Sequence, residues 1–194
     1  MKKKQIILIG LDNDLIDQFK SSKDYKLIGT LDKNIKTKGV IGNDYNFSTE
    51  KQYFYILTLD NPQKKEEVYE KFYSKRKFAN FISKKANISG DAVYGIGNIF
   101  QLGVKIMKNV RIGDHCKINI DSTIHHDCNV GNFNTLAPGV RLLGNVIIGN
   151  NVFIGSNAIV LPGIKIGNNC IIGAGSLVNR NVSNNNKVFG VPAK

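Results

Sequence analysis

An aliphatic residue occupies every sixth position from 112 to 178, with no break in register. The residue two positions earlier is usually small or β-branched, and the residue that follows is often glycine. A period of six fits neither an α-helix nor a simple alternating strand. It predicts short strands separated by corners, three of which close one triangular coil of a parallel β-helix. The aliphatic positions are Ile112, Ile118, Ile124, Val130, Leu136, Leu142, Ile148, Ile154, Val160, Ile166, Ile172 and Val178.

The same period predicts how the coils stack. Residues eighteen positions apart should lie above one another, so we expect Ile112 to align with Val130 and both to point into a shared interior. Glycines such as Gly113 and Gly131 should turn the corners, because glycine adopts φ values that other residues resist. The pattern extends backwards to Ile88, so we expect the solenoid to begin near that residue.

The first part of the chain has a different pattern. Apolar runs that read as strands alternate with amphipathic stretches that read as helices, which predicts a small open α/β (Rossmann-like) domain with a largely parallel sheet. We expect this domain to span residues 1–80 and the β-helix to span 81–194. The predicted elements are strands over 4–10, 25–32 and 52–59, helices over 12–20 and 64–77, and a connection over 78–86.

In open α/β sheets, ligands bind beyond the carboxyl ends of the strands. The candidate contact segments are therefore Gly10–Asp14 and Asp32–Lys33. The first segment is a poor phosphate cradle, because it has one glycine and two aspartates where a phosphate loop offers bare N–H groups. Taken alone, it is as consistent with an ordinary strand–helix turn as with a binding loop.

Composition narrows the functional classes. The chain has 194 residues, 42% of them hydrophobic, and a net charge of +12. It has no tryptophan and no alternation of basic and aromatic residues, so we do not expect nucleic-acid binding. A basic surface also suits an enzyme whose substrates carry phosphates. The apolar run 5–10 is too short for a signal peptide, no run approaches the ~18 residues of a membrane span, and no CxxC occurs, which together predict a cytoplasmic protein.

The repeat departs from its pattern once, at Ile124-His125-His126-Asp127. His126 should point outward from a corner beside a carboxylate, which is an arrangement typical of a general base. The alternative is a solvated corner histidine with no function. A zinc site is not expected, because His115, His125 and His126 lack the spacing of three ligands. The threonine ladders of ice-binding solenoids are absent from the sequence.

Several motifs together resemble one family. They are Ile-His-His-Asp-Cys at 124–128, Gly-Asn-Val at 144–146, the Ile-Gly pairs at 148–149 and 154–155, Val-Leu-Pro at 160–162 and Gly-Val-Pro-Ala-Lys at 190–194. This set is similar to the bacterial acetyltransferases of the sialic-acid O-acetyltransferase type. Within them it most resembles the N-acetyltransferases that act on nucleotide-linked 4-amino sugars. The resemblance implies a left-handed β-helix, acetyl-CoA as co-substrate, no metal and a homotrimer with shared sites.

The resemblance also implies roles for individual residues. His126 would be the base, Asp127 its acidic neighbour, and Gly144 the donor of an N–H to the thioester carbonyl. Two departures from the family pattern stand out: the N-terminal loop lacks the usual histidine, and Thr135 occupies the place of a second histidine near the cofactor. The implied acetyl-CoA contacts are Gly144, Ser156, Ala174 and Thr135, and the implied substrate contacts are Gly10, Asp12, Asn13, Asp14, Asp32 and Lys33.

These features predict direct acetyl transfer to the 4-amino group of a nucleotide-linked sugar, with no covalent acyl-enzyme. Cys128 lies at an interior position of the repeat, which argues against its acting as a nucleophile. Two alternatives remain open at this point. The same base would serve an O-acetyltransferase acting on sialic acid or a similar hydroxyl acceptor. The altered N-terminal loop leaves a non-catalytic protein that binds sugar nucleotides as the other possibility.

Overall fold

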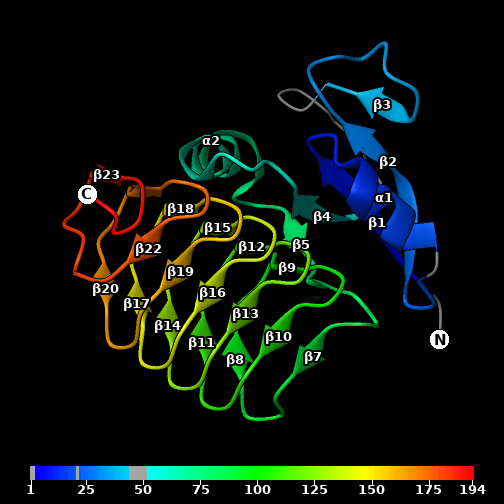
Figure 1. Ribbon diagram of the computed structural model, residues 1–194. Coiled ribbons are helices and arrows are strands. Elements are labelled where there is room, and N and C mark those ends of the chain that lie inside the picture. The colour runs from blue at the N-terminus through cyan, green and yellow to red at the C-terminus, as the bar shows by residue number, and fades with distance from the viewer. Residues whose placement is uncertain (1–2, 21, 44–51) are drawn as a thin grey trace.

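The structure is a computed structural model that describes residues 3–20, 22–43 and 52–194. The described chain forms a five-stranded parallel sheet followed by a triangular β-helix (Figure 1). No helix among the described residues is long and apolar enough to cross a membrane.

The N-terminal sheet has the order β3-β2-β1-β4-β5, and all of its strand pairs are parallel. One face packs on α1 (Asn13–Lys20) and the other on α2 (Pro62–Val68) with the π-helical turn η1 (Tyr69–Tyr73). A parallel sheet covered on both faces explains why β1 is almost continuously apolar. The strands are β1 (Lys4–Ile9), β2 (Tyr25–Leu31), β3 (Val40–Gly42), β4 (Phe54–Leu57) and β5 (Lys77–Phe78).

The second predicted helix differs from the observed one at both ends. It begins at Pro62, because the Asn61 side chain accepts the Lys64 N–H at 2.8 Å and proline suits the first helical position. It ends as a π-helical turn at Tyr73, four residues before the predicted end. The chain then enters β5 at Lys77.

The β-helix has three faces of two-residue strands, which we name by a central strand. The β13 face contains β7 (Asn87–Ile88), β10 (Lys105–Ile106), β13 (Thr123–Ile124), β16 (Arg141–Leu142), β19 (Ile159–Val160) and β22 (Leu177–Val178). The β14 face contains β8 (Val93–Tyr94), β11 (Arg111–Ile112), β14 (Asn129–Val130), β17 (Ile147–Ile148) and β20 (Lys165–Ile166). The β15 face contains β6 (Phe81–Ile82), β9 (Ile99–Phe100), β12 (Lys117–Ile118), β15 (Thr135–Leu136), β18 (Phe153–Ile154), β21 (Ile171–Ile172) and β23 (Lys187–Val188).

The predicted stacking is confirmed. Ile112 pairs with Val130, and Val130 with Ile148, each eighteen residues apart. All twelve aliphatic positions of the repeat are buried in one interior cluster. The three cysteines are buried there too, and each thiol donates to a carbonyl of the next coil at 3.0 Å. The parallel sheets and hexapeptide repeats fit a left-handed β-helix.

The expected start of the solenoid was wrong by one strand. β6, at Phe81–Ile82, already pairs with β9 and forms the first rung of the β15 face. Phe81 is buried, but it packs with Phe19 of α1 rather than with the interior of the solenoid. Ile82, six residues before Ile88, packs against the interior of the solenoid, so the period extends to this strand.

The expected role of the glycines was also wrong. From Ile106 to Ile172, the corners are turned by the third residue after each aliphatic position, for example Asn109 and Asp127, which have φ of 58° and 60°. Gly113 and Gly131 do not have positive φ. They are required because successive coils approach closely: a Cβ on Gly131 would lie 2.7 Å from the Gly149 carbonyl oxygen.

Candidate functional site

His126 and Asp127 lie at the edge where the β13 face turns into the β14 face. Both side chains are exposed, at 58% and 43%, and His126 Nδ1 lies 2.7 Å from Asp127 Oδ2. Asp127 turns the corner with a left-handed backbone, at φ of 60°. The structure therefore confirms that the imidazole points outward and contacts the neighbouring carboxylate.

A third side chain, which the sequence analysis missed, completes this pair. Asn109 lies one coil earlier, and its Nδ2 donates to Asp127 Oδ1 at 3.0 Å. The hydrogen bonds from Asn109 and His126 lower the pKa of Asp127 below its ordinary value. The sequence could have predicted this contact, because Asn109 precedes Asp127 by eighteen residues and residues at that interval stack in successive coils.

Gly144 lies one coil after His126 on the same edge. A Cβ at this position would lie 2.6 Å from His126 Cε1 and 2.7 Å from Nε2, so any side chain would displace the ring. Its carbonyl accepts the Gly163 N–H at 3.0 Å, whereas its own N–H has no acceptor among the described residues. This edge thus presents an imidazole and a free N–H side by side.

A cavity of about 400 Å³ lies between the carboxyl ends of β1 and β4 and the β15 face. It brings together four residues that the sequence singled out, and His126 does not line it. Its lining residues are Leu11, Asp12, Asp14, Asp60, Gln101, Lys117, Asn119, Thr135, Ala137, Pro138, Phe153 and Ser156.

Asp12 has two structural partners within this cavity. Its Oδ1 accepts the Leu15 N–H at 2.9 Å and so caps α1. Its Oδ2 lies 2.8 Å from the ammonium of Lys117, which also contacts Asp60 Oδ1 at 2.7 Å and the Thr58 carbonyl at 3.0 Å. Burial alone would lower the pKa of Lys117, but the two carboxylates raise it above its ordinary value. Lys117 therefore ties two loops of the N-terminal sheet to the β-helix.

Thr135 is fully buried, and its hydroxyl is engaged by a buried lysine. Lys65 of α2 donates to Thr135 Oγ1 at 3.0 Å, to the His115 carbonyl at 3.1 Å and to the Asn134 carbonyl at 3.3 Å. Burial lowers the pKa of Lys65 to about 7. α2 thus docks on the β15 face through an ammonium group bound to neutral acceptors.

This docking predicts a pH-dependent stability. The pKa of lysine is 10.5 in the unfolded chain and that of Lys65 is about 7 in the folded chain. Between pH 7 and 10.5 the unfolded state therefore binds more protons at this side chain than the folded state does. The free energy of unfolding should therefore rise with pH from 7 to 8.5, by up to about 1.4 kcal/mol per unit. In urea unfolding at several pH values, Lys65→Met should lose this rise and the control Lys71→Met, on an exposed side chain, should keep it. Parallel curves for the two variants would contradict the prediction.

The other predicted substrate residues surround the ends of β1 and β2. Asp32 accepts the Leu11 N–H at 3.0 Å and the Asn34 N–H at 2.9 Å, so its carboxylate joins the two loops. Gly10 is buried with φ of 96°, and a Cβ there would lie 2.8 Å from Thr58 Oγ1. Asn13 and Lys33 are exposed.

Ser156 and Ala174 stack eighteen residues apart on a second edge, between the β15 and β13 faces. Ser156 is half-buried and Ala174 is exposed. Within one chain, the predicted cofactor residues are thus divided among two edges and one face, and the base lies on a different edge from the substrate cavity.

His115 was expected to be a simple turn residue. It does have φ of 56°, but its ring is buried and stacks on Phe133 with centroids 5.1 Å apart. Tyr69 and Phe78 also contact this ring, and burial lowers its pKa to about 4. The packing of η1 on this corner buries it, which the repeat alone does not reveal.

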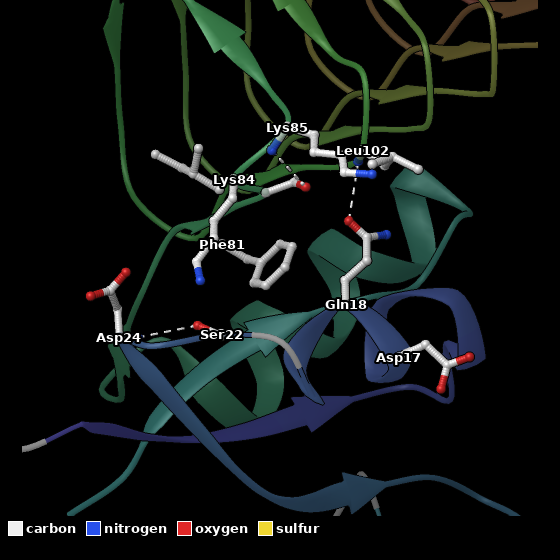
Figure 2. A pocket seen from close by; sticks show the side chains of 10 residues that line it. Asp17, Gln18, Ser22, Asp24, Phe81, Lys84, Lys85 and Leu102 are labelled. Atoms are coloured by element: carbon white, nitrogen blue, oxygen red, sulfur yellow. Dashed lines mark hydrogen bonds between the residues drawn. The ribbon is translucent and has the colours of Figure 1, made fainter.

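A second cavity, of about 430 Å³, lies between α1 and the first coil (Figure 2). Figure 2 shows Gln18 reaching across it, where its Oε1 accepts the Leu102 N–H at 3.1 Å. None of the predicted site residues lines this cavity. Among the described residues, no group of three or more His, Cys, Asp or Glu side chains could hold a metal ion.

Comparisons with known proteins agree with the repeat. Residues 145–180 match the bacterial transferase hexapeptide family (six repeats). A segment of 70 residues is 40% identical to GDP-perosamine N-acetyltransferase of Escherichia coli O157:H7, covering 36% of this chain and 32% of that protein. The aligned segment thus spans about a third of that relative.

Two solved structures align over nearly the whole chain. A histidine-to-alanine mutant of the GDP-perosamine N-acetyltransferase of Caulobacter crescentus, in complex with CoA and GDP-perosamine, is 26% identical with a TM-score of 0.86. The match covers 98% of this chain and 95% of that one. The acetyltransferase domain of PglB from Neisseria gonorrhoeae, with acetyl coenzyme A, has the same fold at 23% identity and a TM-score of 0.88, covering 100% and 99%. In its repeat and in its fold, the chain is therefore similar to the bacterial hexapeptide-repeat transferases.

Proposed function

We propose that this chain is an acetyl-CoA-dependent N-acetyltransferase that acts on the 4-amino group of a nucleotide-linked amino-deoxy sugar. The observation that carries the proposal is the outward His126–Asp127 pair beside the free N–H of Gly144. The similarity to a GDP-perosamine N-acetyltransferase structure over 98% of the chain supports the acceptor class.

In this mechanism, Nε2 of His126 accepts a proton from the amine as its nitrogen attacks the thioester carbonyl carbon. Asp127 accepts a hydrogen bond from Nδ1–H and stabilises the imidazolium that forms. The Gly144 N–H stabilises the developing oxyanion. The C–S bond then breaks, CoA leaves as thiolate, and the imidazolium can return a proton to it.

The geometry does not favour a covalent acyl-enzyme on Cys128. Its thiol is buried and donates to the Leu143 carbonyl at 3.0 Å. Burial raises the pKa of Cys128 to about 11, so the nucleophilic thiolate is scarce at neutral pH. Direct transfer from acetyl-CoA is the simpler route.

We further infer that residues 1–80 form a Rossmann-like nucleotide-sugar domain and residues 81–194 the acetyltransferase domain. The strand order of the first sheet reverses between β1 and β4, and ligands bind beyond such a point in open α/β sheets. Gly10, Asp12, Asp32 and Lys33 lie on the loops that follow β1 and β2, and Asn13 and Asp14 form the start of α1. Division near residue 80 is supported by the change of sheet between β5 and β6.

We infer a homotrimer because one chain separates the parts of the site. His126 lies on the edge between the β13 and β14 faces, whereas the cavity lined by Asp12 lies against the β15 face. Ser156 and Ala174, the proposed acetyl-CoA contacts, lie on another edge, which joins the β15 and β13 faces. A neighbouring copy that packs along the β-helix would bring its own base to this cavity.

The experiment is a thiol-release assay with acetyl-CoA and a panel of UDP-, GDP- and dTDP-linked 4-amino sugars, with sialic acid as a hydroxyl acceptor. Thiol release that depends on one amino sugar is the expected result. Release only with the hydroxyl acceptor would establish an O-acetyltransferase. Tight binding of a nucleotide sugar without any release would favour a non-catalytic binding protein.

A further inference from the structure

We propose that Asn109 is a positioning residue for the acid–base pair, because its amide fixes the Asp127 carboxylate that in turn orients His126. This inference rests on the proposed function of His126 as a base. The three side chains form one continuous chain of hydrogen bonds: Asn109 Nδ2 to Asp127 Oδ1 at 3.0 Å, and Asp127 Oδ2 to His126 Nδ1 at 2.7 Å.

The backbone places the amide and the carboxylate together. Asn109 and Asp127 occupy the same corner position of successive coils and have φ of 58° and 60°. The Asp127 N–H donates to the Lys108 carbonyl at 3.0 Å, which holds the two corners in register. The repeat thus brings the Asn109 amide within hydrogen-bonding reach of the Asp127 carboxylate.

The chemistry of the contact is directional. A carboxylate only accepts hydrogen bonds, so the Asn109 group that faces it must be the NH₂. By occupying Oδ1, the amide stops the carboxylate from rotating and leaves Oδ2 for the ring. An ionised Asp127 keeps the proton of a neutral His126 on Nδ1, so that Nε2 is free to accept a proton from the substrate.

The other charged groups near the pair do not substitute for this amide. Lys108 lies beside Asp127 and favours its ionised form by charge alone. Asp91 and Arg111 line the same groove as Asn109 and Asp127, along the β14 face, and His125 precedes His126 in the chain. Within the described ranges, the side chains with a hydrogen bond to Asp127 are those of Asn109 and His126.

The test compares three variants of the full chain. Asn109→Gly removes the amide and keeps a residue that tolerates positive φ. Asn109→Asp keeps the shape and adds a second negative charge. The matched control is Asn169→Gly, on another edge. Asn169 has φ of 57°, and its Nδ2 donates an equivalent side-chain hydrogen bond to Asn185 Oδ1 at 3.1 Å, which glycine removes.

Asn109→Gly should lower kcat about tenfold with KM for both substrates unchanged, because one hydrogen bond to a charged group is lost. It should move the acid limb of the pH–rate profile to lower pH, since a freely rotating carboxylate stabilises the imidazolium less. Asn109→Asp should move that limb to higher pH, since the added carboxylate stabilises the imidazolium more. Asn169→Gly should leave both kcat and the limb unchanged.

NMR titration of the His126 ring provides a readout that needs no turnover, and His126→Gln identifies its signal among the three histidines. Opposite displacements of the midpoint in the two Asn109 variants support the positioning role. Unchanged midpoints, or a loss of kcat equal to that of Asn169→Gly, would overturn it. If the wild-type chain transfers acetyl to no acceptor while the midpoints still move apart, the proposed function fails and the positioning of His126 by Asn109 stands.

Discussion

His126→Gln should lower kcat by about 10²–10⁴-fold at saturating acetyl-CoA and acceptor, since general base catalysis typically contributes that much. Glutamine keeps a polar side chain of similar reach on the outward edge but does not accept a proton at neutral pH. KM for either substrate should change little, because the ring acts on the proton that leaves the amine.

The matched control is His125→Gln, at the adjacent position. His125 is half-buried, its N–H donates to the Leu142 carbonyl at 2.9 Å, and it is not part of the Asp127 pair. It should retain turnover within a few-fold of wild type. A His126→Gln enzyme with near-normal kcat would show that another group removes the proton.

Lys117→Met should destabilise the chain by about 3 kcal/mol, since removal of one partner leaves a buried carboxylate without compensation. The side chains of Lys117 and Asp12 are 5% and 10% exposed, whereas that of Asp60 is 66% exposed. The loss should therefore come mainly from Asp12. Urea unfolding measures the change in free energy directly.

A second variant isolates the charge. Lys117→Met combined with Asp12→Asn should recover much of the lost stability, because asparagine still caps α1 and carries no charge. Lys105→Met, at an exposed strand position of the β13 face, is the control and should change stability by less than about 0.5 kcal/mol. Equal unfolding free energies for the Lys117 and Lys105 single variants would contradict the proposed stabilisation of Asp12 by Lys117.

The sequence was sufficient to predict the β-helix because each coil repeats the same local requirement. An aliphatic residue at every sixth position must face the interior, so the register of Ile112, Val130 and Ile148 follows from the period. The role of the glycines was misjudged because the requirement comes from the close approach of neighbouring coils. The linear sequence does not show the distance between neighbouring coils.

Contacts between the N-terminal sheet and the β-helix were beyond the reach of the sequence. Lys65 and Lys117 have the sequence pattern of solvated surface lysines, yet both are buried where the two parts meet. His115 is buried for the same reason. Each position depends on the docking of α2 and of the β1 and β4 loops on the β15 face.

The candidate site was partly predictable. The adjacency of His126 and Asp127 indicated an outward pair, and Gly144 follows His126 by one coil. Asn109 precedes Asp127 by the same interval, so the stacking rule could have identified it. The cavity that joins Asp12, Asp14, Thr135 and Ser156 could not be predicted, since it forms only when the N-terminal loops meet the β-helix.

Transfer of a ¹³C-labelled acetyl group from acetyl-CoA to a nucleotide-linked 4-amino sugar, followed by NMR of the product, is the most direct measurement. The account predicts a labelled amide on N4 of the sugar with the wild-type chain and almost none with His126→Gln. A labelled ester on a hydroxyl group, or equal amounts of amide from both proteins, would contradict it.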